Sequence, residues 1–95
     1  RDGSTILPSV FTLSQNYPNP FNPVTTISYS LPVASHVTLD IFNILGQKVV
    51  TLVNENQTAG QHTVTWAAGQ HASGIYLYRL STPDAVETKK MLLLK

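Results

Sequence analysis

Three prolines fall within six residues near the start of the chain, in the segment from Tyr17 to Pro23. Each proline fixes its own φ angle, lacks a backbone N–H donor and pushes the preceding residue out of the helical region. The segment must therefore be extended and stiff, and it cannot lie in the interior of a sheet. We expect it to carry the chain from one sheet to another, with Phe21 filling part of the core.

Helix signals are nearly absent from the rest of the chain, because Pro and Gly interrupt every window long enough for a stable helix. Strand signals instead recur about every 10 to 12 residues, the spacing of a β-sandwich. The segments that show them are 10–14, 25–31, 36–41, 48–53, 61–66, 75–80 and 86–94. They predict an all-β fold, a seven-stranded antiparallel immunoglobulin-like sandwich.

Turns and loops separate the predicted strands. Asn43-Ile44-Leu45-Gly46 fits a type I turn closed by a left-handed glycine, which is a common hairpin connection. Residues 54–58 are expected to form a polar loop, 67–74 a second loop and 81–84 a turn.

Tyr76 gives the predicted sandwich a more specific character. In immunoglobulin-like domains a tyrosine near the start of the sixth strand bonds back to the preceding corner, and Tyr76 has that position. Tyr78, two residues later, takes the inward position that antibody domains give to cysteine. The residues expected in the core are Phe21, Ile27, Leu39, Trp66 and Tyr76.

The length and charge of the chain restrict its possible functions. Its 95 residues suffice for one domain, which we place at 10–95, with 1–9 as a linker from a larger protein. The net charge is +1 without a basic stripe, which argues against a nucleic-acid partner. No apolar run approaches the ~18–20 residues of a transmembrane segment, and no signal peptide opens the chain. The absence of cysteine excludes a disulfide scaffold and a cysteine nucleophile.

No group of residues predicts a catalytic, cofactor or metal site. The sequence places no two of its five acids together, as glycoside hydrolysis would require. His36, His62 and His71 lie on different segments without metal-ligand spacing. There is no G-x-S-x-G elbow and no phosphate-binding glycine loop. We therefore predict that the chain is not an enzyme.

Two weaker patterns leave an alternative function open. Asn56-Gln57-Thr58 matches an N-glycosylation sequon, a pattern that often arises by chance. The tyrosines and Trp66 could stack on sugar rings if they were exposed in one plane, although core packing is their expected use. The alternative is a non-catalytic carbohydrate-binding or spacer module of a secreted hydrolase, which would need an exposed aromatic strip or a calcium site.

Four apolar residues occupy positions where polar ones are usual. Ile44 and Leu45 are the centre of a tight turn. Leu92 and Leu94 share one face of the last strand, while the apolar residues beside them take the other, and a sandwich strand should be polar on its outer face. Either other parts of the molecule cover these side chains or they form a recognition patch.

The motifs in this chain also match a known family, in order and over nearly its whole length. The matching residues are 11–23, 26–29, Leu31-Pro32, 43–47, Ala59-Gly60, 64–66, 73–76, Arg79-Leu80 and 89–92. On these residues the chain resembles the type A C-terminal sorting domain of proteins that Bacteroidetes-related bacteria export by the type IX secretion system. Many members carry Trp-Asp-Gly where this chain has Trp66-Ala67-Ala68-Gly69, which predicts a changed loop. A similar immunoglobulin-like fold occurs in flagellar hook-capping proteins.

The resemblance implies that the domain directs an N-terminal passenger, in transit through the periplasm, across the outer-membrane type IX translocon. A sortase-like peptidase usually cuts before the domain, and the passenger reaches the cell surface or the extracellular space. The family points to the Gly46-Gln47 region, the start of the sixth strand and the last strand with its lysines. Together with the apolar positions above, the candidate recognition residues are Ile44, Leu45, Gly46, Gln47, Gly74, Tyr76, Lys89, Lys90, Leu92 and Leu94.

Overall fold

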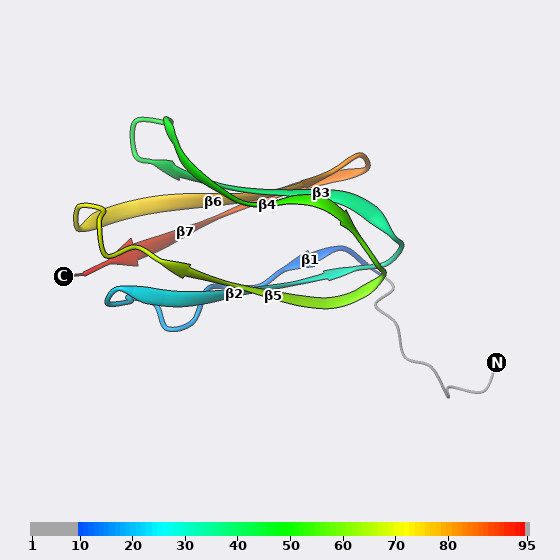
Figure 1. Ribbon diagram of the computed structural model, residues 1–95, viewed down its shortest axis with the longest axis horizontal. Helices are drawn as coiled ribbons and strands as arrows, with labels where there is room; N and C mark the ends of the chain where they lie inside the picture. The colour runs from blue at the N-terminus through cyan, green and yellow to red at the C-terminus, as the bar shows by residue number, and fades with distance from the viewer. Residues whose placement is uncertain (1–9, 95) are drawn as a thin grey trace.

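The computed structural model describes residues 10–94, and the predicted linker 1–9 lies outside the described residues. As predicted, seven strands form two antiparallel sheets (Figure 1). The strands are β1 Thr12–Leu13, β2 Val24–Leu31, β3 Ser35–Asn43, β4 Lys48–Gln57, β5 Gly60–Ala67, β6 Gly74–Thr82 and β7 Ala85–Leu93. Residues 10–94 contain no helix, and thus no helix that could cross a membrane.

The two sheets have the orders β1-β2-β5 and β4-β3-β6-β7. In immunoglobulin constant domains the fourth strand belongs to the sheet of the first, second and fifth, whereas here β4 pairs with β3. The molecule measures 49 × 24 × 16 Å. Figure 1 shows the β3–β4 turn, the start of β6 and the end of β7 at one end of the long axis, and the start of β1 toward the other.

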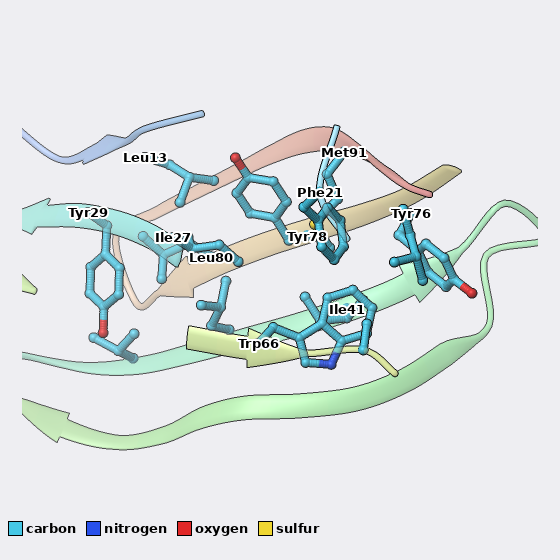
Figure 2. Packing of buried hydrophobic residues seen from close by; sticks show 14 of the residues in the cluster. Leu13, Phe21, Ile27, Tyr29, Ile41, Trp66, Tyr76, Tyr78, Leu80 and Met91 are labelled. Carbon is cyan, nitrogen blue, oxygen red and sulfur yellow. The ribbon is translucent and has the colours of Figure 1, made fainter. Parts of the chain in front are cut away.

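The core lies between the sheets and follows the alternation along the strands. From β2, Ile27, Tyr29 and Leu31 point inward, and every second residue of β3 from Val37 to Ile41 faces them. The five residues predicted for the core are all buried. Figure 2 shows the aromatic part of this core, where the Trp66 ring centroid lies 5.8 Å from that of Phe21 and 5.5 Å from that of Tyr76.

Both predicted tyrosine positions of β6 are confirmed. The Tyr76 hydroxyl donates to the Ala72 carbonyl at 2.6 Å, which is the expected corner bond. Tyr78 points inward, where its hydroxyl donates to the Ser14 carbonyl at 2.7 Å and accepts the Asn16 N–H at 2.8 Å. Burial of this hydroxyl raises the pKa of Tyr78 to about 12.

The proline segment does not cross between sheets, and that prediction was wrong. β1 and β2 are antiparallel neighbours in the same sheet, so the segment leaves this sheet and returns to it. The prolines prevent a continuous ladder, but the residues between them keep their N–H groups. Tyr17 bridges Thr26 of β2, whereas Phe21 bridges Leu93 of the opposite sheet. The segment thus contacts both sheets, and Phe21 is buried as expected.

The predicted polar loop 54–58 was also wrong, because β4 continues to Gln57. β4 is an edge strand, and its side chains beyond Val53 reach water while its backbone still pairs with β3. Polar composition alone therefore did not distinguish strand from loop. The 43–46 turn forms as predicted: Gly46 has a φ of +84° and its N–H donates to the Asn43 carbonyl at 3.0 Å.

Candidate functional site

The β3–β4 turn holds two apolar side chains in water. The Asn43 side chain organises the turn, since its Oδ1 accepts the N–H groups of Leu45 (2.9 Å) and Gln47 (3.0 Å). Its Nδ2 donates to Gln47 Oε1 at 2.9 Å. Because the polar groups are bonded within the turn, Ile44 and Leu45 point outward and are 70% and 80% exposed.

A hollow of about 280 Å³ separates this turn from the start of β6. It is lined by Asn43, Ile44, Leu45, Ala72, Ser73, Gly74, Ile75 and Tyr76. Tyr76 is itself a core residue, so it contributes little accessible surface to the hollow. The neighbouring Ile75 points away from the core, toward the outer face of the sheet, and is 41% exposed.

The end of β7 separates the two lysines of the predicted site. Lys89 lies on the inner face with Met91 and is half-buried, whereas Lys90 is exposed on the outer face. Leu92 and Leu94 are on the same outer side as Lys90; Leu92 is half-buried and Leu94 is 47% exposed. A second hollow, of about 230 Å³, is lined by Asn19, Ile75, Lys90, Met91 and Leu92.

Ile75 lines both hollows, so the turn, the start of β6 and the end of β7 form one continuous surface. We call its apolar side chains the apolar end; they are Ile44, Leu45, Ile75, Leu92 and Leu94. The predicted residues that line the two hollows are Ile44, Leu45, Gly74, Tyr76, Lys90 and Leu92. Gly46 and Gln47 shape the turn beside them, and Lys89 lies on the other face.

Residues 15–21, most of which belong to the proline segment, close the outer edge of β7. The N–H and C=O groups of alternate β7 residues point away from β6. At the end of the strand each of these groups has a hydrogen-bond partner in residues 15–21. The bonds run from Gln15 Nε2 to the Lys90 carbonyl (2.8 Å), from the Leu92 N–H to Asn19 Oδ1 (3.0 Å), from the Phe21 N–H to the Leu92 carbonyl (3.0 Å) and from the Leu94 N–H to the Phe21 carbonyl (2.9 Å). This edge therefore offers no free backbone groups between the Lys90 carbonyl and the Leu94 N–H.

Sequence reasoning missed three residues that lie beside the predicted ones. They are Phe42, Leu77 and Lys48, and the register places Phe42 next to both Leu77 and Lys48. Leu77 in turn lies opposite Lys90. The alternation along β3 and β6 assigns Phe42 and Leu77 to the outer face of the sheet, where polar residues are usual. Their apolar character at these positions is the signal that could have revealed them.

The surface has little else that indicates chemistry. Among residues 10–94, no three His, Asp or Glu side chains are grouped to hold a metal ion. Of the tyrosines and the tryptophan in this range, Tyr17 alone is exposed, and the others pack in the core. A third hollow, of about 440 Å³, lies at the opposite end between 34–36 and 56–58, where His36 contacts Asn54 and Asn56. The described residues thus provide no aromatic strip of the kind a carbohydrate-binding module uses.

The chain matches a known protein family over most of its length. The family model described as the secretion system C-terminal sorting domain matches residues 15–94, which include the proline segment and strands β2 to β7. No curated protein matches the chain.

Proposed function

Because this chain belongs to the family of secretion system C-terminal sorting domains, we propose that the outer-membrane translocon of the type IX system recognises its folded surface. The observation that supports this most strongly is the extent of the family match, which spans residues 15–94. The chain is a sorting signal for type IX secretion, and the protein that contains it carries a passenger to the cell surface or the extracellular space.

The apolar end is the proposed contact surface for the translocon. Monomeric domains rarely expose several large apolar side chains side by side unless they bind something. Here the exposed side chains come from three separate segments that the fold brings together around two hollows. Covering Ile44, Leu45 and Leu94 on docking would contribute roughly 1.5–3 kcal/mol for each fully buried side chain.

The rest of the proposed route follows from the family. The passenger and the domain pass through the periplasm together, and a sortase-like peptidase separates them after export. The family is not catalytic, and we propose that this domain likewise performs no reaction. Residues 1–9 serve as the linker between passenger and domain, and the domain comprises 10–95.

Replacing both exposed turn residues tests the contact directly. In the protein with its passenger, Ile44→Ser with Leu45→Ser should lower the exported amount at least about tenfold, because ~1.4 kcal/mol of lost docking energy suffices for that change. The passenger should accumulate in the periplasm. The matched control is Val33→Ser with Val86→Ser, which removes two exposed apolar side chains elsewhere on the domain.

A second variant addresses the end of β7. Leu92→Thr with Leu94→Thr keeps strand propensity and leaves the buried neighbours Met91 and Leu93 unchanged, so export should fail while the retained protein still resists protease. Normal export by both double variants would refute the apolar end as the contact surface. An equal loss in the Val33 and Val86 control would do the same.

A further inference from the structure

The outward side chains of the four-stranded sheet change in character along the strands. The register aligns them in rows across β7, β6, β3 and β4. The rows are Leu92 and Ile75; Lys90, Leu77, Phe42 and Lys48; Thr88, Arg79, Asp40 and Thr51; and Val86, Ser81, Thr38 and Asn54. The first row is apolar and belongs to the apolar end, and the second row is apolar at its centre, at Leu77 and Phe42. The third and fourth rows are polar across β6 and β3.

Cations border this apolar area on three sides. Lys90 and Lys48 end the second row at its two edges, and both are exposed. Arg79 stands in the third row, where its guanidinium lies 4.6 Å from the centroid of the Phe42 ring. This contact holds the charge at the boundary between the apolar and polar rows.

Accessible carboxylates are missing from the same four rows. Their single acid, Asp40, is only 7% exposed, and its Oδ1 accepts the Thr51 hydroxyl at 2.6 Å. Glu87 of β7 points to the opposite face, where its carboxylate accepts the Leu13 N–H at 3.2 Å. The outer face therefore presents three cationic side chains around an apolar centre, and the single anion of these rows, Asp40, is largely covered.

The β7 edge cannot serve as the contact instead. Adding a partner strand requires free N–H and C=O groups along the edge, and those between Lys90 and Leu94 already bond to Gln15, Asn19 and Phe21. A partner at this end of the domain must consequently contact side chains.

We propose that the partner is a protein surface with an apolar centre and a rim of carboxylates, which docks on the half of the outer face of β3, β6 and β7 that adjoins the apolar end. This deepens the proposed function and rests on it. The apolar end and the second row fill the partner's centre, and Lys48, Arg79 and Lys90 meet its carboxylates. Complementary rim charges of this kind mainly raise the association rate and exclude wrong partners.

Removing the two edge cations tests the charge requirement. Lys48→Gln with Lys90→Gln should lower export of the passenger-bearing protein by about three- to tenfold, and Lys48→Glu with Lys90→Glu should lower it further. The matched control is Gln61→Glu with Thr63→Glu, which lies on the exposed side of β5 in the other sheet and also lowers the formal charge by two. We expect the control to export normally.

The outcomes distinguish failure of the acidic-rim proposal from failure of the apolar end as the translocon contact. If the lysine variants export normally while Leu92→Thr with Leu94→Thr does not, the apolar contact stands and the acidic rim is refuted. An equal loss in the Gln61 and Thr63 control would also refute it, because net charge alone would then explain the effect. Binding of the whole protein to vesicles of phosphatidylglycerol and phosphatidylethanolamine, lost in the lysine variants, would show an anionic membrane as the partner and overturn the assignment to a protein.

Discussion

The Tyr78 hydroxyl joins β6 to residues 14–16, which lead into the proline segment, and its removal gives the sharpest test of the fold. Tyr78→Phe deletes two hydrogen bonds at once, the donor bond to the Ser14 carbonyl and the acceptor bond from the Asn16 N–H. Asn16 is buried, so its N–H would have no partner, at a cost of about 1–3 kcal/mol. The lost bond to Ser14 adds roughly 1 kcal/mol. We expect the free energy of unfolding to fall by about 2–4 kcal/mol.

Tyr76→Phe is the matched control in the same strand. It deletes a single bond, to the carbonyl of Ala72, which is an exposed residue whose carbonyl water can solvate instead. The expected loss is therefore about 1 kcal/mol. Urea unfolding followed by the fluorescence of Trp66, the sole tryptophan, measures both variants with one probe.

The test compares how much each variant lowers the free energy of unfolding. If Tyr78→Phe is no more destabilising than Tyr76→Phe, water reaches Asn16 in solution, and the hydroxyl does not hold residues 14–16 to β6. A Tyr76→Phe variant with unchanged stability would show that the corner bond contributes nothing.

Three further predictions concern pH, the turn and the core. Burial raises the pKa of Tyr78 from 10.0 to about 12, so the unfolded chain loses this proton first as pH rises. The contribution of Tyr78 to stability should be full below about pH 10 and fall toward pH 12. Melting experiments at alkaline pH should show this fall, and it should be less steep for Tyr78→Phe. Gly46→Ala should cost about 1 kcal/mol, measured by urea unfolding, because Gly46 has a φ of +84° although a Cβ there would meet no atom within 4 Å. Leu39→Ala should cost about 2–5 kcal/mol in the same assay, since Leu39 is fully buried in the centre of β3.

Local patterns predicted most of the fold because burial on one face dictates every second residue. Ile27 and Leu39 were identified from alternation alone, and Tyr76 from its place near the start of the sixth strand. The proline segment was different. Its restricted backbone predicted an extended path, but the choice of partner for Phe21 depends on β7, which follows much later in the chain.

The candidate site divides in a similar way. Exposure of Ile44 and Leu45 could be predicted because a four-residue turn has no interior to bury them. The row that joins Lys90 to Lys48 could not, since it depends on which strands are neighbours and on their register. A shift in the β3–β4 pairing between Ile41 and Phe42 puts Lys48 beside Phe42, and no local pattern indicates such a bulge.

The closed edge of β7 also protects the chain against aggregation. Three consecutive apolar residues end this strand and a fourth, Leu94, follows it; such a run with a free edge is a template for pairing with other chains. The residues that cover the edge come earlier in the sequence; Asn19 precedes its partner Leu92 by 73 positions. Synthesis therefore completes the cover before the strand that needs it, and β7 need not wait for a protecting segment. Substitutions that loosen residues 15–21 should consequently promote oligomers even where the core between the sheets stays intact.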